Sequence, residues 1–106
     1  MTAKNRKRQL QEMLAEDPHD PFLRYGLAME FVGEGNDTEA VRSLQELLVA
    51  TPDYVPAYLQ VGQALRRMGR ISEARELFGR GITVAQQQGD THAAEEMQGF
   101  LAALDE

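Results

Sequence analysis

Apolar residues recur three and four positions apart along six segments of the chain, and this spacing places them on one face of an α-helix. The six segments are marked by Leu10, Met13 and Leu14; by Leu23, Leu27 and Phe31; by Ala40, Val41, Leu44, Leu47 and Leu48; by Tyr58, Val61 and Leu65; by Ala74, Leu77, Phe78, Ile82 and Ala85; and by Ala94, Met97, Leu101 and Leu104. The period-two alternation typical of a strand is not found. The pattern therefore predicts an all-α chain of about six amphipathic helices.

Residues that favour helix ends separate these segments. The expected N-caps are Asp20, Asp53, Ser72 and Asp90, and Asn36 with Glu39 has the spacing of a capping box. The expected left-handed closing residues are Gly33, Gly35, Gly69 and Gly89. The connections between helices are short, so successive helices are expected to be antiparallel neighbours.

The chain also repeats itself at a shift of 34 residues. The shift places Gly35 on Gly69, Glu39 on Glu73 and Ala40 on Ala74, and it pairs residues of one class at Leu27 and Val61, Ala28 and Gly62, Phe31 and Leu65, Thr38 and Ser72, Leu44 and Phe78, and Leu48 and Ile82. Small, large and turn positions each meet a different packing demand, so agreement at all three predicts two copies of one helix-turn-helix unit.

A 34-residue unit with this arrangement of small and large positions resembles the tetratricopeptide repeat family. The copy over 55–88 carries the family pattern at Tyr58, Val61, Gly62, Leu65, Gly69, Ala74, Phe78 and Gly81, but Gln86 stands where the family has a closing proline. The copy over 21–54 carries it at Leu27, Ala28, Phe31, Gly35, Ala40, Leu44 and Pro52, with Arg24 where a large apolar residue is usual and Leu47 where a small one is. The resemblance implies a right-handed array of antiparallel helix hairpins.

The expected organisation is a single domain over residues 1–106, similar in size and layout to short, stand-alone bacterial proteins of this family. Residues 3–18 resemble the second helix of a leading half-repeat, and residues 90–105 resemble a closing helix. Two repeats are fewer than the three or so that an array usually needs, so these flanking helices are expected to cap the exposed ends of the repeats.

Composition and charge exclude several classes of function. The chain has 42% hydrophobic and 26% charged residues and no Cys, which fits one ordinary soluble domain and excludes thiolate metal sites and thiol nucleophiles. Four of the eleven basic residues, Lys4, Arg6, Lys7 and Arg8, lie at the start of a chain with a net charge of −6. The acidic remainder would repel a phosphate backbone, so we expect no nucleic-acid partner. No run approaches the roughly 18 apolar residues of a membrane span. We therefore expect a cytoplasmic protein.

Candidate catalytic and metal-binding residues are sparse. His19 and His92 are isolated in sequence, and neither Ser43 nor Ser72 lies in a nucleophile motif. The carboxylates fall largely on the polar faces of the expected helices, where solvated charge accounts for them. We expect no enzyme, no metal and no cofactor.

By the resemblance, the usual ligand site is the concave groove lined by the first helix of each unit. The residues expected there are Phe22, Tyr25, Met29 and Val32 from the first copy and Leu59, Gln63, Arg66 and Arg67 from the second. Apolar side chains beside a concentration of arginine favour binding of a peptide or protein segment with apolar and acidic character. The carboxylate clamp known in the family needs Lys and Asn at positions that are Tyr25, Met29 and Gln60 here, so that clamp is not expected.

Two other interpretations stay open at this point. Phe22 and Tyr25 could pack against the leading helix as ordinary core, with the arginines paired to Glu30 or Glu34. The chain could also be a self-associating structural or scaffold protein, in which a homodimer completes the short array.

Overall fold

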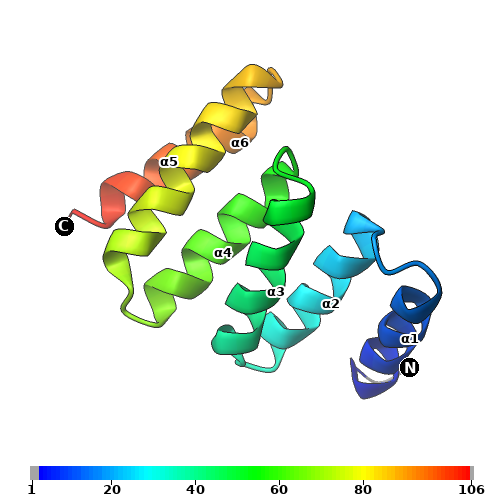
Figure 1. Cartoon of the computed structure of the whole chain (residues 1–106). Coiled ribbons are helices and arrows are strands. Elements are labelled where there is room, and N and C mark those ends of the chain that lie inside the picture. The colour runs from blue at the N-terminus through cyan, green and yellow to red at the C-terminus, as the bar shows by residue number, and fades with distance from the viewer. Residues whose placement is uncertain (1–2, 106) are drawn as a thin grey trace.

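The computed structural model describes the backbone of residues 3–105 and the side chains of residues 5–105, and over that range the chain is all-α. Its helices are α1 (Ala3–Glu16), α2 (Pro21–Gly33), α3 (Asp37–Ala50), α4 (Val55–Arg67), α5 (Ile71–Gln87) and α6 (Thr91–Ala103). They form an elongated array of antiparallel hairpins with the two termini at opposite ends (Figure 1), measuring 39 × 28 × 23 Å. The predicted fold class is confirmed. Residues 1, 2 and 106 of the expected domain, and the side chain of Lys4, lie outside the described residues.

The helices recur at the interval found in the sequence. Both ends of α4 lie 34 positions after those of α2, and α5 begins 34 positions after α3. None of the helices described is long and apolar enough to cross a bilayer.

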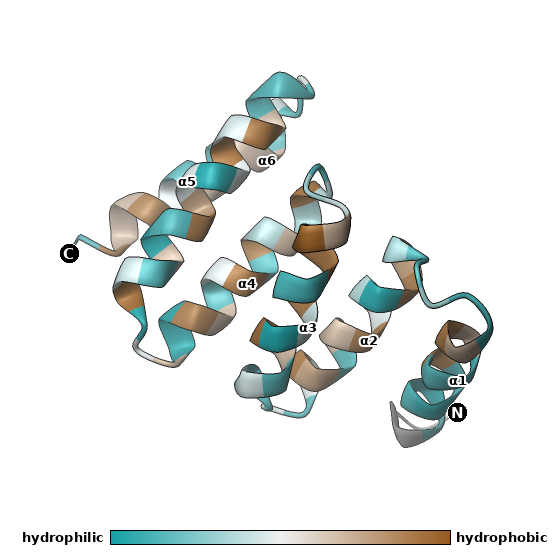
Figure 2. Ribbon diagram, in the orientation of Figure 1, coloured by the Kyte–Doolittle hydropathy of each residue, from teal (hydrophilic) through white to brown (hydrophobic). Residues whose placement is uncertain are grey.

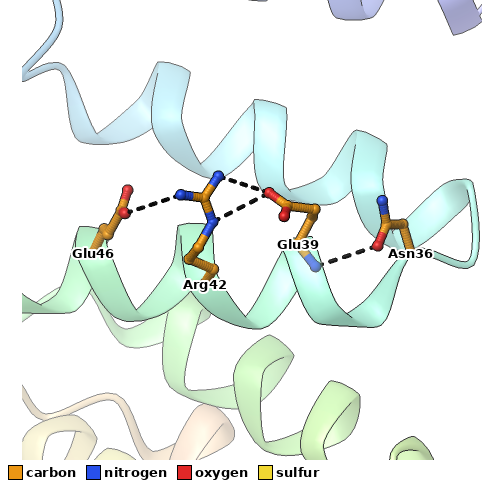
Figure 3. A network of polar contacts seen from close by, with 4 residues as sticks. All are labelled: Asn36, Glu39, Arg42 and Glu46. Atoms are coloured by element: carbon orange, nitrogen blue, oxygen red, sulfur yellow. Dashed lines mark hydrogen bonds and ion pairs between the residues drawn. The ribbon is translucent and has the colours of Figure 1, made fainter.

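Three of the predicted helix caps are present. The side chain of Asp20 accepts hydrogen bonds from the backbone amides of Phe22 and Leu23, and Asp90 accepts one from Ala93. Asn36 accepts from the amide of Glu39 at 3.3 Å. The capping box is only half formed, because the Glu39 carboxylate pairs with Arg42 in the next turn (Figure 3).

Other predicted helix ends are wrong by one or two residues. The N-caps of α4 and α5 are Tyr54 and Arg70, and neither forms a side-chain cap. The backbone carbonyl oxygen of Asp53 instead accepts a hydrogen bond from the side-chain amide of Gln88 at 2.6 Å. Ser72 lies inside the first turn of α5. The left-handed conformation occurs at Gly35, Gly69 and Gly89, whereas Gly33 is the last residue of α2 and has no positive φ.

The core lies between the helices of the array and continues from α2 to α6. Its largest fully buried side chains are Tyr58, Phe78, Leu44, Leu47, Leu65, Met97 and Val61. The helix α1 has no side chain in this core and is largely hydrophilic in Figure 2. It is attached to α2 by contact of Leu10 with Gly26 and by ion pairs of Arg6 and Lys7.

Candidate functional site

The eight predicted groove residues lie on two helices, four on α2 and four on α4. We call them the α2–α4 face: Phe22, Tyr25, Met29, Val32, Leu59, Gln63, Arg66 and Arg67. Phe22 is 72% exposed and both arginines are exposed, whereas the other five side chains are half-buried. The face therefore combines accessible apolar surface with positive charge.

Tyr25 connects the two helices of this face. Its ring lies 5.4 Å from that of Tyr54, the N-cap residue of α4, and its hydroxyl forms a hydrogen bond with the side chain of Gln60. Burial, and to a lesser extent the neighbouring Tyr54, raise the pKa of Tyr25, while the bond to Gln60 partly lowers it. Burial also raises the pKa of Tyr54, with a smaller contribution from Asp20. Both phenols are thus neutral and act as fixed, uncharged contacts.

The same contacts bear on the interpretation of Phe22 and Tyr25 as ordinary core against the leading helix. Phe22 is too exposed to be ordinary core, and Tyr25 packs on Tyr54 in the loop between α3 and α4. Sequence reasoning missed Tyr54 as a neighbour of the face, because it lies in a connection outside the helical periodicity.

The arginines expected on this face have different surroundings. Arg67 makes a two-pronged ion pair with Asp37 at the start of α3, with nitrogen–oxygen distances of 2.9 to 3.2 Å. Arg70, the N-cap residue of α5, lies outside the face and pairs in the same way with Glu73 in the first turn of α5. Arg66 makes no ion pair or side-chain hydrogen bond with the residues that the structure describes. Of the three neighbouring arginines, Arg66 therefore presents the available cation.

The carboxylates that could have neutralised these arginines are engaged elsewhere. Glu30 faces Arg6 at 3.6 Å, and Glu34 faces Lys7 at 3.2 Å, both across the contact between α1 and α2. In the structure, therefore, neither Arg66 nor Arg67 is paired with Glu30 or Glu34.

Gln63 lies one turn before Arg66 on the same side of α4. Its Oε1 atom is buried and has no hydrogen-bond partner among the described residues. A buried acceptor without a donor costs on the order of 1–3 kcal/mol, so a donor that reached Oε1 of Gln63 would be stabilising.

Among the residues that the structure describes, no group of three or more histidine and carboxylate side chains lies close enough together to hold a metal ion. His19 and His92 are both exposed on the surface.

The antiparallel helix hairpins recur every 34 residues, and the first helix of each hairpin exposes one face. This arrangement defines a class of proteins built from repeats. No protein-family model matches the chain. A TPR repeat-containing protein of Pseudomonas aeruginosa is 31% identical over 96 residues, covering 91% of each chain. The solution structure of a tetratricopeptide repeat domain protein from Salinibacter ruber has a TM-score of 0.77 and 33% identity, covering 82% of this chain and 88% of that one.

A complex of the TPR2B domain of yeast Sti1 with pHsp70 has a TM-score of 0.90 at 17% identity, covering 97% of this chain and 82% of that one. At that identity the likeness concerns the fold alone. From the similarity to the Pseudomonas aeruginosa protein over nearly its whole length, the chain belongs to the tetratricopeptide repeat family.

Proposed function

We propose that the chain is a non-enzymatic protein-interaction module that binds a peptide or protein segment on the α2–α4 face. The observation that carries the proposal is the free guanidinium of Arg66, which shares one side of α4 with Gln63 and Leu59 in a chain of net charge −6. An exposed cation beside apolar side chains suits a segment with acidic and apolar residues.

The packing supports rigid display of this face. Tyr25, Tyr54 and Gln60 fix α2 against α4, and the Arg67–Asp37 pair fixes the end of α4 against the start of α3. A face held before association loses little conformational entropy when the partner binds. Two helices offer an interface near the small end of the usual range, so the affinity is expected to be modest.

The likeness to known proteins agrees with this proposal at the level of the fold. The Sti1 domain with the same arrangement of helices forms a complex with pHsp70. For the present chain, the chemistry of the partner is inferred from the side chains of the α2–α4 face. We further propose that the interaction takes place in the cytoplasm.

The test uses peptides selected from a randomised, phage-displayed library on the native chain. A selected peptide is labelled, and its dissociation constant is measured by fluorescence anisotropy for the native chain and two variants. Arg66→Gln removes the free cation of the face, and Arg8→Gln removes an exposed charge on α1, outside the face. We expect a loss of about tenfold for Arg66→Gln and no change for Arg8→Gln.

Equal effects of the two variants would refute the proposal, and so would peptides that carry no acidic residue. The homodimer remains a prediction, and sedimentation over a range of protein concentrations tests it. A dimer that dissociates when peptide is added would indicate that the same face also serves self-association.

A further inference from the structure

Three large apolar side chains are strongly exposed in the part of the chain that the structure describes: Met13 at 51%, Phe22 at 72% and Val49 at 86%. Phe22 belongs to the α2–α4 face, whereas Met13 lies on α1 and Val49 on α3. Valine is β-branched and has a low preference for an exposed position inside a helix, so neither packing nor helix propensity accounts for Val49. Met13 and Val49 therefore each mark an apolar surface that the described residues leave uncovered.

Val49 lies at a hollow of about 350 Å³ between α3 and α5, which we call the α3–α5 groove. The groove is lined by Gln45, Leu48, Val49, Leu77 and Arg80. Leu48 and Leu77 are buried, so the floor of the groove is apolar. The guanidinium of Arg80 lies over the Tyr58 ring at 5.7 Å and makes no ion pair or side-chain hydrogen bond with the described residues. The groove thus combines an apolar floor with one positioned cation.

Met13 lies on a surface of the opposite charge. The exposed side of α1 carries a group of residues that we call the α1 stripe: Gln9, Glu12, Met13 and Glu16. Glu12 and Glu16 are one helical turn apart, and neither makes an ion pair or a side-chain hydrogen bond with the described residues. The cations Arg6 and Lys7 of the same helix face α2 instead. The α1 stripe thus presents an exposed methionine beside two unpaired carboxylates.

We propose that the α1 stripe of one copy of the chain docks into the α3–α5 groove of a second copy. A cavity of about 150 Å³ in another protein holds benzene, which has more heavy atoms than a methionine side chain, so the groove has room for Met13. The flexible thioether of methionine adapts to irregular apolar surfaces. With Met13 in the groove, Glu12 and Glu16 face Arg80, and attraction between these opposite charges favours this pairing of surfaces.

Charge complementarity between two surfaces of one chain argues for a second copy as the occupant. Pairing of stripe with stripe would bring carboxylates together, and pairing of groove with groove would bring guanidinium groups together, so the contact joins two different surfaces. It leaves the α2–α4 face free, and the inference therefore does not depend on the proposed function. One side of a single helix buries less area than a stable interface needs, so the dissociation constant is expected to be on the order of 0.1 mM.

The test is sedimentation equilibrium of the native chain and of charge-reversed variants, from about 10 μM to about 1 mM protein at low salt. The average mass of the native chain is expected to rise above that of one chain over this range and to fall when salt is added. Glu12→Lys with Glu16→Lys reverses the stripe, and Arg80→Glu reverses the groove. Each variant alone should stay monomeric. An equimolar mixture of the two should associate again, because the reversed stripe matches the reversed groove and the native stripe matches the native groove.

Matched controls change the net charge by the same amounts at exposed positions outside both surfaces. These are Glu95→Lys with Glu96→Lys on α6 and Arg75→Glu on α5, and both should associate like the native chain. Arg66→Gln should also associate normally, with or without a peptide that binds the α2–α4 face. A native chain that is monomeric at about 1 mM would overturn the proposal. So would stripe and groove variants that associate alone, a mixture of them that stays monomeric, or dissociation of the native chain by the peptide.

Discussion

Gly81 of α5 lies directly against Tyr58 of α4. A Cβ atom at Gly81 would be 2.5 Å from the Cβ of Tyr58 and 2.6 Å from the Sδ of Met97. Gly62 has a similar place on α4, where a Cβ would come within 3.0 Å of the Phe78 ring. Two glycines inside helices thus let α4 and α5 approach until each large ring packs against backbone.

This approach predicts the effect of adding one methyl group. Gly81→Ala gains up to about 1 kcal/mol in helix propensity, but the clash with Tyr58 should cost more, for a net loss of about 1–2 kcal/mol. Gly79→Ala, in the same helix, meets no atom within 4 Å and should stabilise the chain by about 0.5–1 kcal/mol. Urea unfolding measures both. Stabilisation by both alanines would show that the helices are not in close contact at Gly81.

The hydroxyl of Tyr58 gives a second prediction. Tyr58→Phe keeps the ring but removes the donor to the Pro52 carbonyl, which should lower the free energy of unfolding by about 1 kcal/mol. Tyr54→Phe is the matched control, because the hydroxyl of Tyr54 makes no hydrogen bond with the described residues. This substitution should change the free energy of unfolding by no more than about 0.5 kcal/mol. Equal losses from the two variants would contradict a structural role for the Pro52 bond.

The two neighbouring arginines are predicted to behave differently. A double-mutant cycle of Arg67→Gln with Asp37→Asn should give a coupling free energy on the order of 0.5–1 kcal/mol that falls as salt is added. The same cycle with Arg66→Gln in place of Arg67→Gln should give no coupling. Coupling between Arg66 and Asp37 would mean that Arg66 is not the free cation of the α2–α4 face.

The raised pKa of Tyr25 predicts a loss of stability in alkali. An unfolded chain releases the phenolic proton at its usual pKa of about 10, before the folded chain does, so the stability due to neutral Tyr25 is complete below about pH 10 and declines above it. Tyr25→Phe removes this contribution. Between about pH 8 and about pH 11, urea unfolding should therefore show a steeper decline for the native chain than for Tyr25→Phe. Equal declines in the free energy of unfolding for the native chain and Tyr25→Phe would contradict a raised pKa of Tyr25.

The helices and their 34-residue interval could be predicted from the sequence, because the burial of Leu44, Leu65 and Phe78 demands apolar residues at helical spacing. Helix starts were less predictable. Both Asp53 and Ser72 are good capping residues, but the chain enters α4 and α5 at Tyr54 and Arg70, where packing of the hairpins fixes the backbone.

The candidate site was predictable only in part. Helical geometry placed its residues on α2 and α4, but the pairing of Arg67 with Asp37 joins residues 30 positions apart and has no local signal.

Amide chemical-shift mapping with a library-selected peptide shows directly whether the α2–α4 face receives a protein segment. Binding on this face should give the largest shifts at Tyr25 and Met29 of α2 and at Leu59, Gln63 and Arg66 of α4, with small shifts on the outer sides of α3 and α5. Largest shifts on α3 and α5, with the α2–α4 face unchanged, would contradict it.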